Sequence, residues 1–173
     1  MALTLLRHAA LAPRHAHRYN GWTDISIDDD LFDEKEISIL KRIDFDFVYS
    51  SDLSRCMQTL ERMEIDDYFT DARLREVRFR DEIEGLNFNE IEKLPSYKKE
   101  YTDHRDRWHQ YICQEHPALF EARIRSFLKD LPKDKELLIC SHGGTLQKMM
   151  ALLGYAKQNI DYLEWIRIDN ENL

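Results

Sequence analysis

Three short apolar runs in the chain each end abruptly in residues that can do chemistry. The runs cover residues 2–6, 45–49 and 137–140, and they lead into Arg7-His8, Ser50-Ser51-Asp52 and Ser141-His142-Gly143. Their length and their sharp polar ends are typical of buried strands. Such strands predict a sheet that is covered on both faces.

Helical patterns lie between and after these runs. Apolar residues recur with the i, i+3, i+4, i+7 spacing of a helix in three segments, 53–60, 124–131 and 146–153. Two less regular segments, 31–43 and 97–114, are also predicted to be helical, the second as a surface helix over the functional site. Strands that alternate with helices predict a three-layer α/β/α sandwich with a mainly parallel sheet.

The carboxyl ends of parallel strands lie at one edge of the sheet, and ligands of such sheets bind there. Arg7-His8, the segment 51–55 and His142-Gly143 are therefore expected to meet although they are far apart in the sequence. This convergence is the basis of every functional expectation below.

The chain is expected to form a single domain, 1–173, because its 173 residues lie within the ~100 to 200 of most single domains. No apolar run approaches the ~18 residues of a spanning helix, and no basic leader precedes an apolar stretch at the start. The three cysteines are too few and too widely spaced for a disulfide framework or a zinc ribbon. We therefore expect a cytoplasmic protein that does not enter membranes.

The formal net charge of -8 at pH 7 disfavours broad binding to nucleic acid or anionic lipid, because such binding depends on clustered Lys and Arg. It leaves room for a small phosphorylated ligand. Charges are screened over about 8 Å at physiological salt, so a local group of arginines can outweigh a distant acidic surface.

Two histidines and two arginines at one rim suggest the handling of a phosphoryl group. The neutral imidazole of one of the two histidines, His8 or His142, can attack phosphorus directly. The guanidinium groups of Arg7 and Arg55 match the non-bridging oxygens and stay charged at any working pH. The second histidine, if protonated, would add a donor where charge accumulates. Gly143 begins a turn that lets a helix N-terminus approach an anion.

An alkoxide leaving group also needs a proton, which a carboxylic acid in the cleft could supply. Glu76, just after the short run that ends at Leu74, is the first candidate. Asp81, Glu82 and Glu84 remain alternatives at this stage.

The sequence resembles the histidine phosphatase superfamily, the phosphoglycerate mutase-like proteins. Five segments carry the resemblance in the order of the family: Leu5-Leu6-Arg7-His8-Ala9, Arg18 to Asp24, Val48 to Thr59, Leu74-Arg75-Glu76 with Glu84-Gly85-Leu86, and Ser141 to Gly144. Together they cover most of the chain, from Leu3 to about Thr145. The resemblance implies a phosphoglycerate mutase-like fold.

The resemblance also implies a role for each matched residue. His8 would be the nucleophile that becomes phosphohistidine, and Arg7 and Arg55 would clamp the phosphate. His142 would stabilise charge, and Glu76 would act as the general acid and then as the base. No metal and no organic cofactor is implied.

The chain departs from the family pattern at two positions near the nucleophile. Ala9 stands where a glycine is usual, and Arg14 stands where the family often has asparagine, which adds a possible third arginine to the pocket. For Arg18 two roles stay open, an anchor for its loop and a contact to substrate.

We therefore expect a phosphomonoester hydrolase that acts on a small phosphorylated metabolite as its partner. The size of the chain and the stretch from Tyr19 to Asp24 are similar to the α-ribazole-phosphate phosphatase branch, which suggests α-ribazole 5′-phosphate as a substrate. Two alternatives stay open: an isomerase of the phosphoglycerate mutase type, and a non-catalytic phosphate-binding module.

Overall fold

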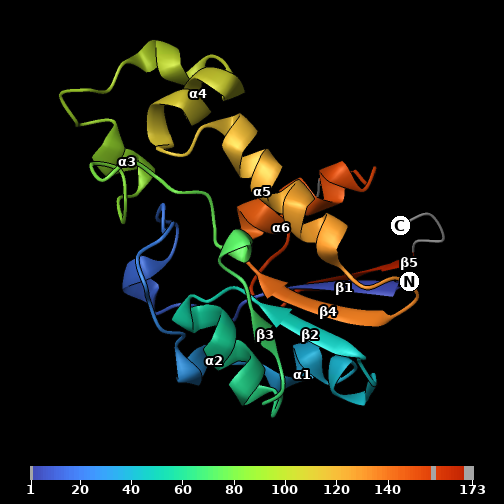
Figure 1. The fold of residues 1–173 in the computed structure, drawn as a ribbon. Coiled ribbons are helices and arrows are strands. Elements are labelled where there is room, and N and C mark those ends of the chain that lie inside the picture. The colour runs from blue at the N-terminus through green and yellow to red at the C-terminus, as the bar shows by residue number, and fades with distance from the viewer. Residues whose placement is uncertain (1, 157–158, 170–173) are drawn as a thin grey trace.

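A five-stranded sheet forms the centre of the molecule (Figure 1). The computed structural model describes residues 2–156 and 159–169. The strands follow the order β3-β2-β4-β1-β5, with bounds β1 Ala2–Arg7, β2 Phe47–Ser50, β3 Phe69–Thr70, β4 Glu136–Ser141 and β5 Trp165–Asp169. Only β5 runs antiparallel to its neighbour. The predicted mainly parallel sheet is thereby confirmed.

Helices cover both faces of this sheet. The α-helices are α1 Glu34–Ile37, α2 Ser54–Arg62, α3 Phe88–Ile91, α4 Arg105–Ile112, α5 Pro117–Asp130 and α6 Gly143–Leu152. Short 3₁₀ helices join them: η1 Pro13–His15, η2 Asp29–Leu31, η3 Leu40–Arg42, η4 Ala72–Leu74 and η5 Lys99–Thr102. Figure 1 shows α5 and α6 on one face and α1 and α2 on the other. The predicted α/β/α layering is confirmed.

The alternation of side chains along each strand supplies both halves of the core. On β1, Leu3 and Leu5 point to the α5–α6 face, whereas Leu6 points to the α1–α2 face. On β4, Leu137 and Ile139 point to the α5–α6 face, and Leu138 and Cys140 point to the α1–α2 face. Successive side chains of a strand point to opposite faces, so a continuous apolar run is needed to fill a core on each side.

A third apolar cluster lies away from the sheet, where α3 and α4 form a separate lobe beyond the carboxyl ends of the strands (Figure 1). Ile83, Ile91, Tyr111 and Ile112 are its buried members, and Tyr19 packs against them. This lobe stands beside the edge of the sheet at which the predicted site residues meet.

Two predicted helices prove to be broken. The segment 31–43 contains only the short α1 between η2 and η3. The carboxylates of Asp28 and Asp33 accept the backbone N–H groups of Asp30 and Lys35, so that each begins a separate short helix. The segment 97–114 is interrupted at His104, whose backbone is extended, so that η5 and α4 are separate. The segment 31–43 is therefore helical only in part, and the segment 97–114, predicted as one surface helix, is two helices.

Candidate active site

His8 lies directly after β1, and its ring is held in one orientation. The Nδ1–H group donates to the carbonyl oxygen of Ala9 at 2.8 Å, and the backbone N–H of Ala9 donates to Oγ1 of Thr59 at 2.9 Å. Since a neutral imidazole carries one proton, this bond leaves the lone pair on Nε2. Burial, with the guanidinium groups of Arg55 and Arg7 nearby, holds the pKa of His8 well below its ordinary value. His8 is therefore a neutral imidazole whose Nε2 is available as a nucleophile.

His142 faces His8 from the end of the neighbouring strand, β4. The two ring centroids lie 5.2 Å apart with an angle of 62° between the ring planes. The parallel register, which places Arg7 beside Ser141, sets this distance. The predicted meeting of the amino-terminal and carboxyl-terminal histidines is found at the edge where the parallel strands end.

Both nitrogens of His142 are engaged. Nε of Arg55, which can only donate, donates to Nδ1 at 3.1 Å. Nε2 must then carry the proton, and it lies 2.9 Å from Oγ of Ser51. Burial and the charge of Arg55 hold the pKa of His142 well below its ordinary value. His142 is thus neutral in this structure, and the expected protonated donor would arise only when a bound anion offsets the neighbouring cations.

Arg55 connects this pair to a neighbouring loop. It stands in the first turn of α2 and is 1 % exposed. Its Nη2 and Nη1 groups donate to the carbonyl oxygens of Gly21 and Thr23 at 2.7 and 2.9 Å. With the bond from Nε to His142, three of its five N–H donors have partners among the described residues, which leaves two that could bind an anion.

Arg7 is the last residue of β1 and directly precedes His8. Its Nη1 donates to the carbonyl oxygen of Ile160 at 2.8 Å, and its guanidinium lies 4.1 Å above the ring of Tyr162. Among residues 2–156 and 159–169, its buried Nε has no hydrogen-bond partner. A buried donor without a partner costs free energy, and a bound oxyanion would remove that cost.

These side chains enclose a cavity of about 120 Å³. Its lining consists of Arg7, His8, Leu11, Arg18, Tyr19, Asn20, Arg55, Glu76, Phe79, His142, Gly143 and Tyr162. We call it the oxyanion cavity. It contains every predicted catalytic residue, together with four of the five predicted binding residues.

Glu76 closes one side of the oxyanion cavity and caps α6. Its Oε2 accepts the backbone N–H of Gly144 at 2.9 Å, and its Oε1 accepts the backbone N–H of Thr145 at 3.1 Å. A Cβ atom on Gly144 would lie 2.5 Å from Oε1 of Glu76. The second glycine of the Gly143-Gly144 pair is therefore needed for the carboxylate to reach this position.

The other three acids proposed from the sequence lie elsewhere. Glu84 accepts the backbone N–H groups of Gly21 and Thr23, which fixes their loop. Asp81 and Glu82 line a separate hollow on the surface. Of the four candidates, Glu76 is the one that lines the oxyanion cavity.

Two predicted binding residues have other roles in the structure. Arg14 is exposed, donates from Nε to His15, and lies outside the lining of the oxyanion cavity. Its expected part as a third arginine in the pocket is not seen, because η1 turns its side chain outward. Arg18 does line the cavity, but its guanidinium is bound to Glu90 and to the carbonyl of Gly85. It anchors the loop.

Tyr162 and Arg123 are two residues of this region that the sequence did not point to. Tyr162 packs against His8 with a centroid distance of 5.5 Å, and the backbone N–H of Leu163 donates to the carbonyl of Arg7. Arg123 on α5 donates to the carbonyl oxygens of Arg75 and Glu76, and it also pairs with Glu115. Neither has a local sequence signal, since only tertiary contacts bring them here.

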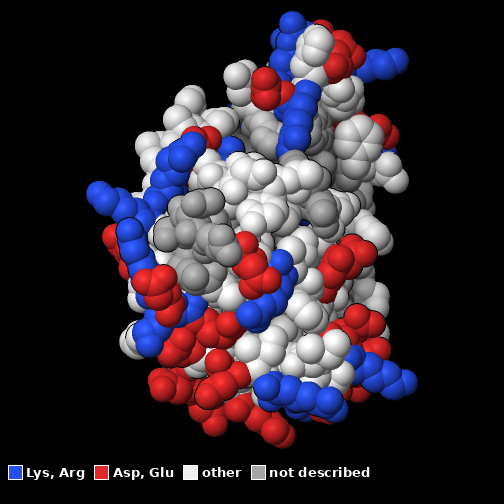
Figure 2. All heavy atoms as spheres, turned by 90° about the vertical axis from the view of Figure 1, so that its right-hand side faces the viewer, with Lys and Arg blue, Asp and Glu red and all other residues white. Residues whose placement is uncertain are grey.

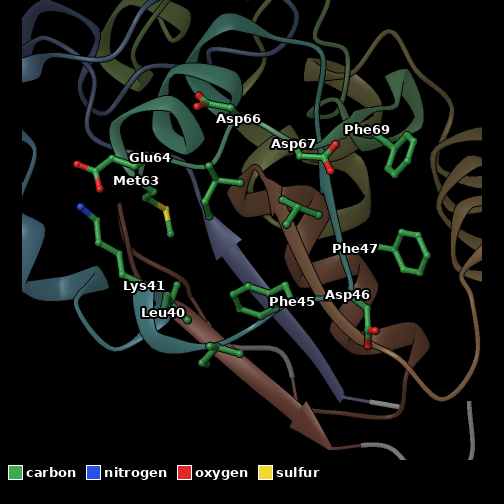
Figure 3. Close-up of a pocket in the computed structure, with 13 residues that line it drawn as sticks. Leu40, Lys41, Phe45, Asp46, Phe47, Met63, Glu64, Asp66, Asp67 and Phe69 are labelled. Atoms are coloured by element: carbon green, nitrogen blue, oxygen red, sulfur yellow. The ribbon is translucent and has the colours of Figure 1, made fainter.

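Charge elsewhere on the molecule is arranged differently. On the face turned to the viewer in Figure 2, Lys and Arg are interspersed among Asp and Glu rather than gathered in a stripe. A hollow at the start of β2, shown in Figure 3, contains four acidic residues, Asp46, Glu64, Asp66 and Asp67, beside Lys41. It lies at the opposite end of the strand from the oxyanion cavity and lacks paired arginines and histidines.

Two kinds of feature are absent from the described part of the chain. No helix within it combines the length and the apolar character that crossing a membrane requires. No three His, Cys, Asp or Glu side chains within the same residues gather in a way that could hold a metal ion.

Comparison with known families gives one match over nearly the whole chain. The model of the histidine phosphatase superfamily (branch 1) matches residues 3–173. No curated protein matches the sequence.

Solved structures with the same fold cover almost all of the chain. The protein TTHB049 from Thermus thermophilus is 22% identical with a TM-score of 0.74, and the match covers 98% of this chain and 94% of that one. A mycobacterial glucosyl-3-phosphoglycerate phosphatase is 19% identical, with a TM-score of 0.72 and coverage of 96% and 88%. A phosphoserine phosphatase from Entamoeba histolytica, solved with 3-phosphoglyceric acid, is 22% identical, with a TM-score of 0.73 and coverage of 96% and 89%.

Proposed function

Because the chain belongs to the histidine phosphatase superfamily, we propose that it hydrolyses phosphate monoesters through a phosphohistidine at Nε2 of His8. The observation that carries this proposal is the arrangement of the two histidines. The bond from Nδ1 of His8 to Ala9 leaves Nε2 unprotonated, and the ring faces His142 in a cavity that two arginines also line. A neutral nucleophile beside fixed cations suits a dianionic phosphoryl group.

In the first step, the lone pair on Nε2 of His8 forms a bond to phosphorus while the bond from phosphorus to the ester oxygen breaks. Arg7 and Arg55 bind the non-bridging oxygens, where charge gathers in the transition state. Glu76, as the carboxylic acid, gives its proton to the departing alkoxide. The alcohol then leaves.

In the second step, a water molecule attacks phosphorus and the bond from phosphorus to Nε2 breaks. The carboxylate of Glu76 takes a proton from that water, which restores the acid. Inorganic phosphate leaves, and His8 returns to its neutral form. Glu76 thus gives one proton to the alcohol and regains one from water in each turnover.

The proposed substrates are small phosphorylated metabolites, and α-ribazole 5′-phosphate is the first compound to test. If the enzyme released no inorganic phosphate but moved the phosphoryl group within a phosphoglycerate, it would be an isomerase instead. Phosphate release measured beside product analysis separates the two reactions.

Trapping the intermediate tests the mechanism directly. Rapid mixing with a labelled ester, followed by alkaline denaturation, should leave one phosphoryl group on the peptide that contains His8. The variant His8→Asn should neither trap the group nor turn over, whereas His104→Asn, a matched change at an exposed histidine, should do both. Turnover by His8→Asn at the normal rate would refute the proposed nucleophile.

A further inference from the structure

A second and larger cavity opens directly beside the oxyanion cavity. Its volume is about 720 Å³, which falls within the ~300 to 1,000 Å³ of small-molecule sites. Tyr19, Glu76 and Phe79 line both cavities, so the two share a wall. We call the larger one the lobe cavity, because α4 supplies much of its lining.

Apolar and aromatic side chains make up much of the wall of the lobe cavity. They are Val77, Phe79, Trp108, Ile112, Pro117, Phe120 and Ala151. Trp108 packs edge-on against Tyr19, with the ring centroids 6.0 Å apart. Burial also raises the pKa of the Cys113 thiol in this wall to about 12, so that the thiol stays uncharged. Flat apolar walls of this kind favour a planar ring over a small polyol or a carboxylate.

Polar and charged side chains make up about half of the lining residues. They are Glu76, Arg105, Asp106, His109, Gln110, Glu115, His116, Gln147 and Lys148. Lys148 is held by Glu121 at 3.3 Å, which offsets its charge. These groups can orient a ligand by single hydrogen bonds, while the apolar surface supplies most of the affinity.

The position of Glu76 decides which part of a substrate would occupy the lobe cavity. An acid that protonates the leaving oxygen must touch that oxygen, so the alcohol part of the ester lies on its side of the phosphorus. Glu76 is in the wall that the two cavities share. This step rests on the proposed function, because it takes Glu76 as the proton donor.

We propose that the lobe cavity binds the alcohol part of the substrate and that this alcohol carries a planar ring system, with the overall size of a nucleoside. Small polar esters such as phosphoglycerates and phosphoserine would leave the apolar wall in contact with water. The ring would lie against Trp108, with the phosphate between Arg7 and Arg55. The enzyme would then select its substrate by the ring as well as by the phosphate.

Matched 5′-phosphates test this proposal. Ribose 5-phosphate is compared with the 5′-phosphates of purine, pyrimidine and benzimidazole ribosides, which share its primary alcohol and differ in carrying a ring. Stacking of a base on an aromatic side chain predicts that kcat/KM rises about 10- to 100-fold for the best ring-bearing ester. If ribose 5-phosphate is hydrolysed as well as every ring-bearing ester, the proposal is wrong.

Two variants locate the effect in the lobe cavity. Trp108→Ala removes the largest aromatic side chain of the wall, and Ala151→Trp fills the cavity from an exposed position on α6, where folding is least at risk. Each should lower the preference for the ring-bearing ester about tenfold. Phe69→Ala removes an aromatic ring that is 55% exposed on the far edge strand, and it should leave the preference unchanged. An unchanged preference in both cavity variants would overturn the proposal.

The two proposals fail in different ways. Absence of hydrolysis for all of these esters, with no phosphoryl group trapped on His8, would count against the proposed function. Hydrolysis with a trapped phosphohistidine but no preference for a ring would leave the proposed function standing and refute the assignment of the lobe cavity.

Discussion

Nε of Arg55 donates to Nδ1 of His142 at 3.1 Å, and this bond determines which nitrogen of the histidine carries the proton. It also links the first turn of α2 to the end of β4, two segments that are 87 residues apart in the chain. The same guanidinium holds the carbonyl oxygens of Gly21 and Thr23. Arg55 therefore positions its neighbours in addition to lining the oxyanion cavity.

Replacement of Arg55 by lysine should lower kcat/KM about 10²- to 10³-fold, the loss typical of removing one donor aimed at developing charge. A single ammonium group cannot reach His142 and both carbonyl oxygens together. Steady-state kinetics on any accepted ester measures this loss. Arg62→Lys, at the exposed end of the same helix, is the control and should behave as wild type. Full activity in Arg55→Lys would show that positive charge alone is enough.

Replacement of Glu76 by glutamine should slow alkyl phosphates far more than p-nitrophenyl phosphate, because a good leaving group needs little protonation. We expect a loss of about 10²-fold or more for alkyl esters, the usual contribution of a general acid. Comparison of kcat for the two ester classes gives the result. Equal losses for both would remove Glu76 from the role of proton donor.

Gly144→Ala should also slow the hydrolysis of alkyl phosphates, although it leaves the side chain of Glu76 unchanged. The added Cβ would lie 2.5 Å from Oε1 of Glu76, so either the carboxylate or the start of α6 must move. Gly143→Ala is the matched change, since its nearest contact is Arg7 at 3.6 Å, an ordinary van der Waals distance. We expect the larger loss of activity on alkyl esters at Gly144. A larger loss for Gly143→Ala than for Gly144→Ala would contradict the described position of the Glu76 carboxylate.

Arg123→Lys should lower the stability of the protein, because Arg123 holds the backbone of the segment that carries Glu76. The arginine and its partner Glu115 are 15% and 12% exposed, and the guanidinium also holds the carbonyl oxygens of Arg75 and Glu76. Loss of one member of a largely buried pair costs about 3 kcal/mol when the partner stays uncompensated; lysine, which keeps the charge, should cost less. Urea unfolding measures the stability change. Arg125→Lys, an exposed pair on the same helix, should change it by less than about 0.5 kcal/mol.

The lowered pKa values of His8 and His142 predict how stability changes with pH. An unfolded chain binds protons at both rings below pH ~6.5, whereas the folded protein does not until its lower pKa is reached. The free energy of unfolding should therefore be highest above pH ~6.5. It should fall as pH drops below this value, by at most ~1.4 kcal/mol per pH unit for each histidine.

Unfolding curves at several pH values between about 7.5 and 5 check this linkage, with the two bounds chosen to bracket the ordinary histidine pKa of about 6.5. His142→Gln should flatten the pH dependence, because it removes one of the two groups. The opposite slope, with stability rising as pH falls, would show that the rings are charged in the folded protein.

The strands that carry the site could be predicted from the sequence, because each is a short apolar run with a polar end. The strands β3 and β5 could not. The first has two exposed residues, and the second contributes a single well-buried side chain, Ile168, so that neither produces a strong apolar pattern.

The candidate site divides in the same way. His8, Arg55, Glu76 and His142 could be predicted, since each follows directly from a strand end or a family motif. Tyr162 could not, because its place depends on the backbone hydrogen bond that joins the next residue to the end of β1, a contact between opposite ends of the chain. Arg14 was placed in the pocket by the motif alone, whereas in the structure it is exposed and lies outside the lining of the oxyanion cavity.

The stretch 105–117 lines the lobe cavity and contributes nothing to the oxyanion cavity. If both proposals hold, this stretch helps to select the alcohol and takes no part in cleavage of the ester. A library of substitutions confined to α4 and the turn that follows it could change which esters are hydrolysed. The residues that line the oxyanion cavity would stay unchanged.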